Sequence, residues 1–164
     1  LQRDLSTIFS TVTPEILYLH QPADKHDTHI AVLTHCLKAL RALPGEKRPR
    51  KVLGCEGWRD LDWMCDHDKQ VIDVSARPHL AAALVGVYDS QINGGKRYDL
   101  AIPGRWHGHA SMLSSHTVDA CTAATLAIDL TPLINGTADS VLEYTLGFID
   151  RFRQDVADRL AKFA

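Results

Sequence analysis

Apolar residues recur at helical spacing in some stretches of the chain and gather in short runs in others. Between residues 28 and 43, Ile30, Leu33, Leu37 and Leu40 fall on one face of a helix. Short apolar runs bounded by polar or turn residues are typical of strands. The pattern predicts helices over residues 1–12, 28–43, 78–91, 96–116 and 141–163, and strands over residues 15–20, 51–55, 70–74 and 123–130.

Helices and strands alternate along the chain, which is the order of an α/β layered domain. We expect a partial Rossmann-like arrangement, with helices packed on a small, mostly parallel sheet. The chain has 164 residues, enough for a single domain over residues 1–164. It opens on a helix and shows few strands, so we expect the C-terminal part of a larger domain. An exposed strand edge would then favour self-association or pairing with the remaining part.

Composition narrows the classes of partner. Hydrophobic residues make up 45% of the chain and charged residues 23%, as in ordinary globular proteins. The net charge of −2 argues against a nucleic-acid partner, and the basic residues 47–51 are predicted to form a solvated loop. No apolar run is long enough to span a membrane, and no signal peptide is visible. Four cysteines without CxxC spacing favour reduced thiols and a cytoplasmic location.

The most informative polar stretch is His26-Asp27-Thr28-His29, between a predicted strand and a predicted helix. Open α/β sheets bind ligands at strand ends, and histidine is both a metal ligand and a neutral-pH acid or base. At spacing i, i+3 the two imidazoles can point into one cleft. A catalytic zinc ion takes three protein ligands, so this pair is incomplete. The other ligands could come from Asp24, Asp27 or His20; alternatively, these histidines are polar loop residues.

The segment Tyr18–Val32 resembles the second signature of the PIG-L/LmbE-like deacetylases, roughly H-P-D-H-x-A after a strand. These zinc-dependent enzymes remove acetyl groups from N-acetylglucosamine-type sugars. Here Asp27-Thr28 stands where Pro-Asp is usual. Leu80–Gln91 is similar to a family helix that closes in Ser-Gln, and Trp58–Trp63 to the polar-aromatic loop of one sugar-deacetylase branch. The resemblance covers roughly residues 1–130.

The resemblance implies roles for individual residues. His29 would be a ligand of zinc, or of another divalent metal, and His26 would polarise the amide carbonyl or protonate the departing amine. Asp24 would orient one of them. The reaction would be amide hydrolysis of an N-acetylated amino sugar, releasing acetate. The family's first signature, A-H-P-D-D-E, does not occur in the chain. We therefore expect its ligands and base to come from a missing N-terminal segment or a partner chain.

Substrate contacts are expected from Trp58 and Arg59 of the polar-aromatic loop, and from Lys96, Arg97 and Arg105, whose basic side chains could hold an anion or sugar hydroxyl groups. The alternatives are an anchored or chain-association loop around Trp58, and a solvated turn and helix face for the others. The rival function is a catalytically inactive carbohydrate-binding or subunit-interaction module of the same fold. Asp62, Asp66, His67 and Asp68 could bind a cation, although no EF-hand spacing is present.

Overall fold

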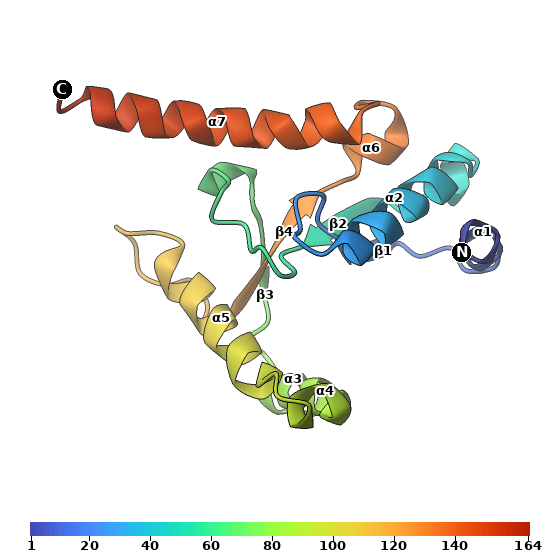
Figure 1. Ribbon diagram of the computed structural model, residues 1–164, viewed down its shortest axis with the longest axis horizontal. Coiled ribbons are helices and arrows are strands. Elements are labelled where there is room, and N and C mark those ends of the chain that lie inside the picture. The colour runs from blue at the N-terminus through green and yellow to red at the C-terminus, as the bar shows by residue number, and fades with distance from the viewer. The chain divides into compact units, whose positions relative to one another are not determined.

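The computed structural model describes residues 1–164 and confirms the predicted α/β class (Figure 1). The strands are β1 (Ile16–His20), β2 (Lys51–Cys55), β3 (Gln70–Asp73) and β4 (Ala124–Asp129). The helices are α1 (Gln2–Thr11), α2 (Asp27–Arg41), α3 (Pro78–Gly86), α4 (Asp89–Asn93), α5 (Tyr98–Met112), α6 (Pro132–Asn135) and α7 (Val141–Ala161). Two 3-10 turns, η1 (Gly45–Lys47) and η2 (Asp66–Asp68), complete the list.

The four strands form one sheet in the order β1-β2-β4-β3. β1 and β2 are parallel, with Ile16 opposite Lys51, whereas β2 and β4 are antiparallel, with Leu53 opposite Asp129. The sheet is therefore mixed, which refines the expectation of a mostly parallel one. β1 lies at an edge and leaves Ile16 39% and Tyr18 55% exposed.

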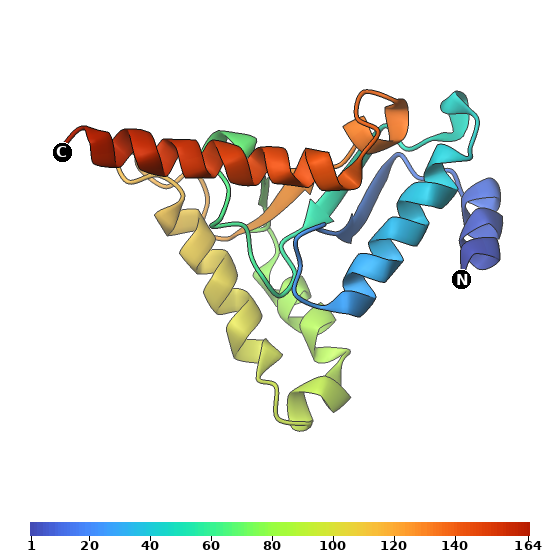
Figure 2. The same cartoon turned by 45° about the horizontal axis from the view of Figure 1, so that its top comes forward.

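The chain divides into two compact units, described here separately. The first comprises Leu1–Gln70 and Ala127–Ala164, the second Val71–Leu126. In the first unit, α2 packs against β1, α1 and α6 (Figure 2). The predicted apolar face of α2 supplies much of its core, because Leu33, Leu37 and Leu40 are buried. In the second unit, α3, α4 and α5 contact one another. A single domain over residues 1–164 stays a prediction.

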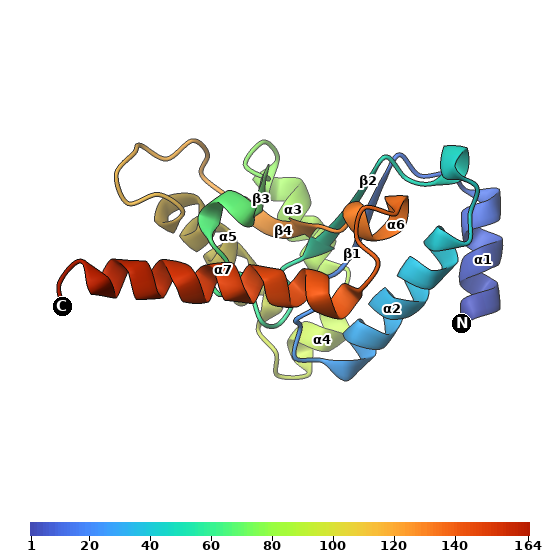
Figure 3. The same cartoon turned by 90° about the horizontal axis from the view of Figure 1, so that it is seen from above.

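The sequence prediction missed a break in one helix and the one-turn helix α6. The helix predicted over residues 78–91 is broken at Val87-Tyr88 into α3 and α4. At the C-terminus, Phe148 of α7 is buried, whereas Phe163, two residues past the end of that helix, is 90% exposed. The reason is that the C-terminal end of α7 lies at the opposite end of the first unit from α1, beyond the core (Figure 3).

The basic stretch 47–51 is not wholly the solvated loop that its composition predicts. The Arg48 guanidinium donates to the carbonyl oxygens of Leu43 (3.0 Å), Ile134 (2.6 Å) and Arg41 (2.8 Å). These carbonyl groups lie at or just past the C-terminal ends of α2 and α6, where carbonyl oxygens have no hydrogen-bond donor within the helix. Arg48 therefore joins two helix ends, while Arg50 pairs with Glu15 at the surface.

All four cysteines are free thiols. None of the helices combines the length and the apolar composition needed to cross a bilayer.

Candidate metal centre

The end of β1 and the start of α2 bring four polar side chains together. β1 ends at His20, a short loop carries Asp24, and His26 is the extended N-cap residue of α2 (φ −106°, ψ 112°). His29 follows in the first turn of that helix. The structure thus gathers His20, Asp24, His26 and His29 within the first unit, as the spacing of the two predicted histidines suggests.

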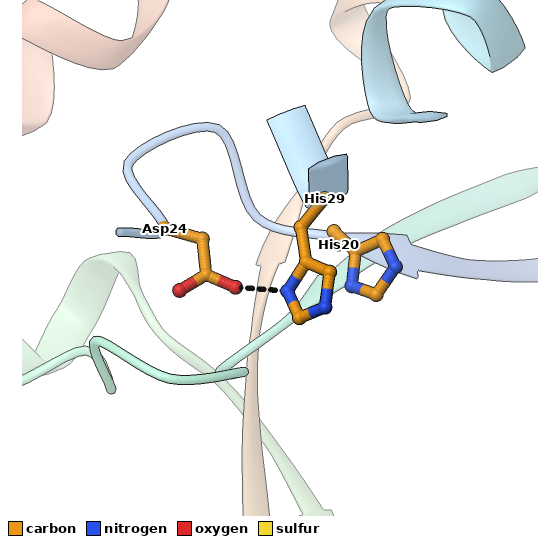
Figure 4. A group of neighbouring side chains, drawn as sticks. All are labelled: His20, Asp24 and His29. Carbon is orange, nitrogen blue, oxygen red and sulfur yellow. Dashed lines mark hydrogen bonds and ion pairs between the residues drawn. The ribbon is translucent and has the colours of Figure 1, made fainter. Parts of the chain in front are cut away.

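The Asp24 carboxylate is the anchor of this group. Its side chain is fully buried, at 0% exposure. Its Oδ1 accepts from the backbone N–H of Lys25 (2.7 Å) and of Trp58 (3.1 Å). Its Oδ2 lies 2.6 Å from Nδ1 of His29 (Figure 4). Sequence reasoning named Asp24 as an orienting group, and this hydrogen bond is the contact through which it can orient His29.

Gly57 makes room for that carboxylate, a role that the sequence reasoning missed. Its φ is +51°, a left-handed conformation that favours glycine. A Cβ atom at this position would lie 2.5 Å from Oδ2 of Asp24. The sequence signal was a glycine two residues after the predicted strand 51–55, since glycine is the residue that adopts a left-handed backbone conformation without strain.

The surroundings of Asp24 favour its ionised form. Burial is the largest single influence on Asp24 and raises its pKa, but the hydrogen bonds from His29, Lys25 and Trp58 together outweigh it. The pKa of Asp24 is therefore below its ordinary value, and the group is an ionised acceptor at neutral pH. A carboxylate can only accept, so Nδ1 of His29 carries a proton, and in the neutral imidazole Nε2 is the nitrogen with the lone pair. This is the usual way in which a carboxylate orients a metal-binding histidine.

The three imidazoles form a stack with His29 in the middle. His20 lies parallel to His29, with ring centroids 3.9 Å apart and planes inclined by 3° (Figure 4). His26 lies near His29, with centroids 4.6 Å apart and an angle of 18°. Burial, with the neighbouring His29 and His26, lowers the pKa of His20 despite the opposing effect of Asp24. His20 is therefore neutral at neutral pH and retains a lone pair.

The donor set can hold a metal ion. The ligand atoms of His20, Asp24 and His29 all lie within 4.8 Å of one another. An imidazole binds an ion in the plane of its ring, and two parallel stacked rings cannot share one ion in both planes. His29 is thus the ligand already oriented, and His20 must turn to become a second. Asp24 is already engaged in three hydrogen bonds.

The polar-aromatic loop Trp58–Trp63 is exposed at its start and packed against the core at its end. Leu61 and Met64 are buried, and Nε1 of Trp63 donates to the carbonyl oxygen of Asp60 (2.9 Å). Trp58 and Arg59 are exposed, and the Trp58 amide is the group bound to Asp24. The anchored interpretation therefore holds for residues 61–64, and the sugar-contact role of Trp58 and Arg59 stays a prediction.

The other predicted contacts, Lys96, Arg97 and Arg105, belong to the second unit. The Arg97 guanidinium donates to both carboxylate oxygens of Asp99, at 2.9 and 2.7 Å. That hydrogen bond raises the pKa of Arg97 and lowers the pKa of Asp99. The structure therefore pairs Arg97 with a neighbouring acid, and its role toward a substrate stays a prediction with those of Lys96 and Arg105.

The resemblance to the PIG-L/LmbE-like deacetylases rests on the signature residues alone and stays a prediction. No protein-family model, no curated protein and no solved structure matches this chain.

Proposed function

We propose that this chain carries the histidine part of a zinc centre that deacetylates N-acetylated amino sugars, similar to the PIG-L/LmbE-like enzymes. The observation that carries the proposal is the 2.6 Å contact between Asp24 Oδ2 and His29 Nδ1. It orients one imidazole and leaves Nε2 for an ion, which a surface histidine does not require. The matching position of His29 in the signature supports the same role.

The roles of the chain's own residues follow from this arrangement. His29, held by Asp24, would be a protein ligand, and His20 a second after its ring turns. A bound zinc ion would lower the pKa of a coordinated water to ~7. His26, exposed beside His29, would donate a proton or hydrogen bond to the carbonyl oxygen or departing amine. A donor of this kind is worth ~3–4 kcal/mol in the transition state of acyl transfer.

The donor count suggests that the centre is shared. Catalytic zinc sites take three protein ligands and leave a position for water. His29 and His20 are two, and Asp24 is occupied by three hydrogen bonds. We therefore propose that the remaining ligand and the base that takes the proton of water come from a segment or partner with the first family signature. Trp58 and Arg59 would contact the sugar from the neighbouring loop.

The test measures zinc and acetate separately. The chain is prepared alone and together with a segment that carries the A-H-P-D-D-E signature. Bound zinc is measured by elemental analysis, and acetate release with N-acetylglucosamine derivatives. We expect more bound zinc, together with turnover, in the complemented form than in the chain alone. His29→Ala should lose the zinc that complementation adds, whereas His26→Ala should keep that zinc and slow turnover; the exposed His116→Ala is the matched control.

Two outcomes would remove the proposal. Full retention of the added zinc by His29→Ala would exclude His29 from the ligands. Sugar binding without acetate release in the complemented form would favour the inactive carbohydrate-binding module.

A further inference from the structure

A second group of metal-binding atoms lies in the first unit, outside the histidine centre. Cys65, His67 and Asp68 come from η2 and the residue before it. Their ligand atoms, a sulfur, a ring nitrogen and a carboxylate oxygen, all lie within 4.8 Å of one another. None of these residues has a part in the proposed deacetylase reaction.

Local structure holds these three residues close together. The amide of Asp68 donates to the carbonyl oxygen of Cys65 (3.0 Å), which closes the 3-10 turn. The buried side chain of Met64 fixes the chain just before it. On the other side, Arg151 of α7 donates to both oxygens of Asp68, at 2.8 and 3.1 Å, so η2 lies beside α7 (Figure 3). Two of the three ligands are thereby preplaced, and His67, whose side chain is 74% exposed, is free to turn toward them.

The donor chemistry selects the class of metal. A purely acidic cluster suits calcium or magnesium, but a thiolate and an imidazole select a borderline-soft ion such as zinc. We infer that Cys65, His67 and Asp68 form a second zinc site, with water in the fourth position. Each ligand type is one that tetrahedral zinc accepts.

Arg151 is the natural competitor of the ion. Without metal, its guanidinium balances the charge of Asp68 through two hydrogen bonds. An ion bound by Asp68 takes at least one of those carboxylate oxygens, so Arg151 must give up a hydrogen bond. The site is therefore expected to bind more tightly when the Arg151 side chain cannot compete.

Cobalt(II) is the probe that separates this site from the histidine centre. A cobalt–thiolate bond gives a charge-transfer absorption in the near ultraviolet, and the histidine centre contains no thiol. We expect one such band per full-length chain, saturating with one equivalent of cobalt and displaced by zinc. Cys65→Ser should abolish it, and His67→Ala should weaken cobalt binding by ~10–100-fold, a loss comparable to that caused by removing a supporting partner of a metal ligand. Arg151→Gln should increase the affinity for cobalt, because the competing guanidinium is removed.

The controls decide the assignment. Cys121→Ser removes another free, partly exposed thiol, and His29→Ala disables the histidine centre; both should keep the band. Absence of the band in the wild type, or its persistence in Cys65→Ser, would overturn the inference. If Cys65→Ser fails to fold, His67→Ala decides, because its exposed imidazole supports no packing; unchanged affinity there would also overturn the site.

Discussion

The hydrogen bond between Asp24 and His29 determines which ring nitrogen would face a bound metal ion. A buried carboxylate is costly unless it is fully hydrogen-bonded, and Asp24 accepts three such bonds. Its hydrogen bond with His29 places a proton on Nδ1 of that ring. The hydrogen bond to Asp24 therefore decides which tautomer the neutral imidazole of His29 adopts.

Asp24→Asn tests that property. The amide keeps the size of the side chain but has one acceptor oxygen instead of two, so it cannot serve His29 and both backbone amides. We expect His29 to lose its fixed tautomer in imidazole nitrogen NMR, and zinc affinity to fall ~10–100-fold. Asp27→Asn, an exposed residue at the start of α2, is the control and should change neither. The same tautomer in both variants would contradict the prediction.

His20 gives the metal-free fold a dependence on pH. Its pKa is lowered below 6.5 in the folded chain by burial and by His29 and His26. As the pH falls below 6.5, the unfolded state takes up this proton first, so the free energy of unfolding decreases. The decrease ends once the folded state is also protonated. Urea unfolding in chelator, above and below pH 6.5, should show a smaller pH effect for His20→Gln than for the wild type. An equal pH effect on the free energy of unfolding of His20→Gln and of the wild type would contradict this role of His20.

Part of this residue-level picture could be predicted from the sequence. The spacing of His26 and His29 at a strand-to-helix junction suggested a shared cleft, and the contact with Asp24 is consistent with an orienting role. The parallel stack of His20 on His29 could not be predicted, because ring orientation depends on side-chain torsions and packing. The sequence left His20 as one of three candidate ligands for the same reason.

At the scale of elements, the loop after β2 reaches back to the loop after β1 through Gly57. Gly57→Ala should destabilise the fold by ~1–3 kcal/mol, because a left-handed φ is strained for alanine and the new Cβ would displace Asp24. The matched control is Gly45→Ala, where a Cβ meets nothing within 4 Å. Chemical denaturation measures both. A Gly57→Ala chain as stable as the control would show that the carboxylate can move aside freely.

Two arginines in the same basic stretch should behave differently. Arg48 donates to three carbonyl oxygens at the ends of α2 and α6. Arg48→Ala leaves those acceptors without their charged donor and should cost ~1.5–3 kcal/mol. Arg50→Ala removes an exposed ion pair with Glu15 and should cost ~0–1 kcal/mol. Equal losses in denaturant unfolding would contradict the assigned role of Arg48.

Apolar periodicity predicted the elements well where they are long. All four strands and the long helices α2 and α7 occur close to their expected positions. The break at Val87-Tyr88 and the one-turn helix α6 were missed, because a single turn contains too few residues to show a period. The role of Arg48 was missed because composition cannot reveal which carbonyls lie near a guanidinium.

At the scale of the whole molecule, the edge position of β1 affects solubility and association. An edge strand offers unpaired backbone groups, and here it also exposes Ile16 and Tyr18. We expect concentration-dependent self-association in sedimentation velocity, reduced by Tyr18→Lys, since an edge lysine opposes strand addition. Tyr88→Lys, at an exposed tyrosine of the second unit, is the control and should leave association unchanged. A monomer at all concentrations would contradict this prediction.

The fold class followed from the alternation of helices and strands, but the direction of β4 did not. β4 comes after the long stretch 74–123, and nothing in its apolar run states from which end it enters the sheet. Its antiparallel pairing with β2 depends on the path of that stretch. The division into two units was likewise not visible, because no Gly-rich or Pro-rich linker marks it.

The bond from the Trp58 amide to Asp24 has a consequence for specificity. The carboxylate of Asp24 accepts hydrogen bonds both from the backbone N–H of Trp58 and from the imidazole of His29, the proposed metal ligand. A sugar that moved the Trp58 peptide would lengthen or shorten its hydrogen bond to Asp24. The Asp24 carboxylate would then interact more strongly or more weakly with His29. Under the proposed function, a change in which sugar is bound would then also change how strongly His29 donates to the zinc ion. Evolution toward a new sugar would therefore alter the reactivity of the water bound to that ion.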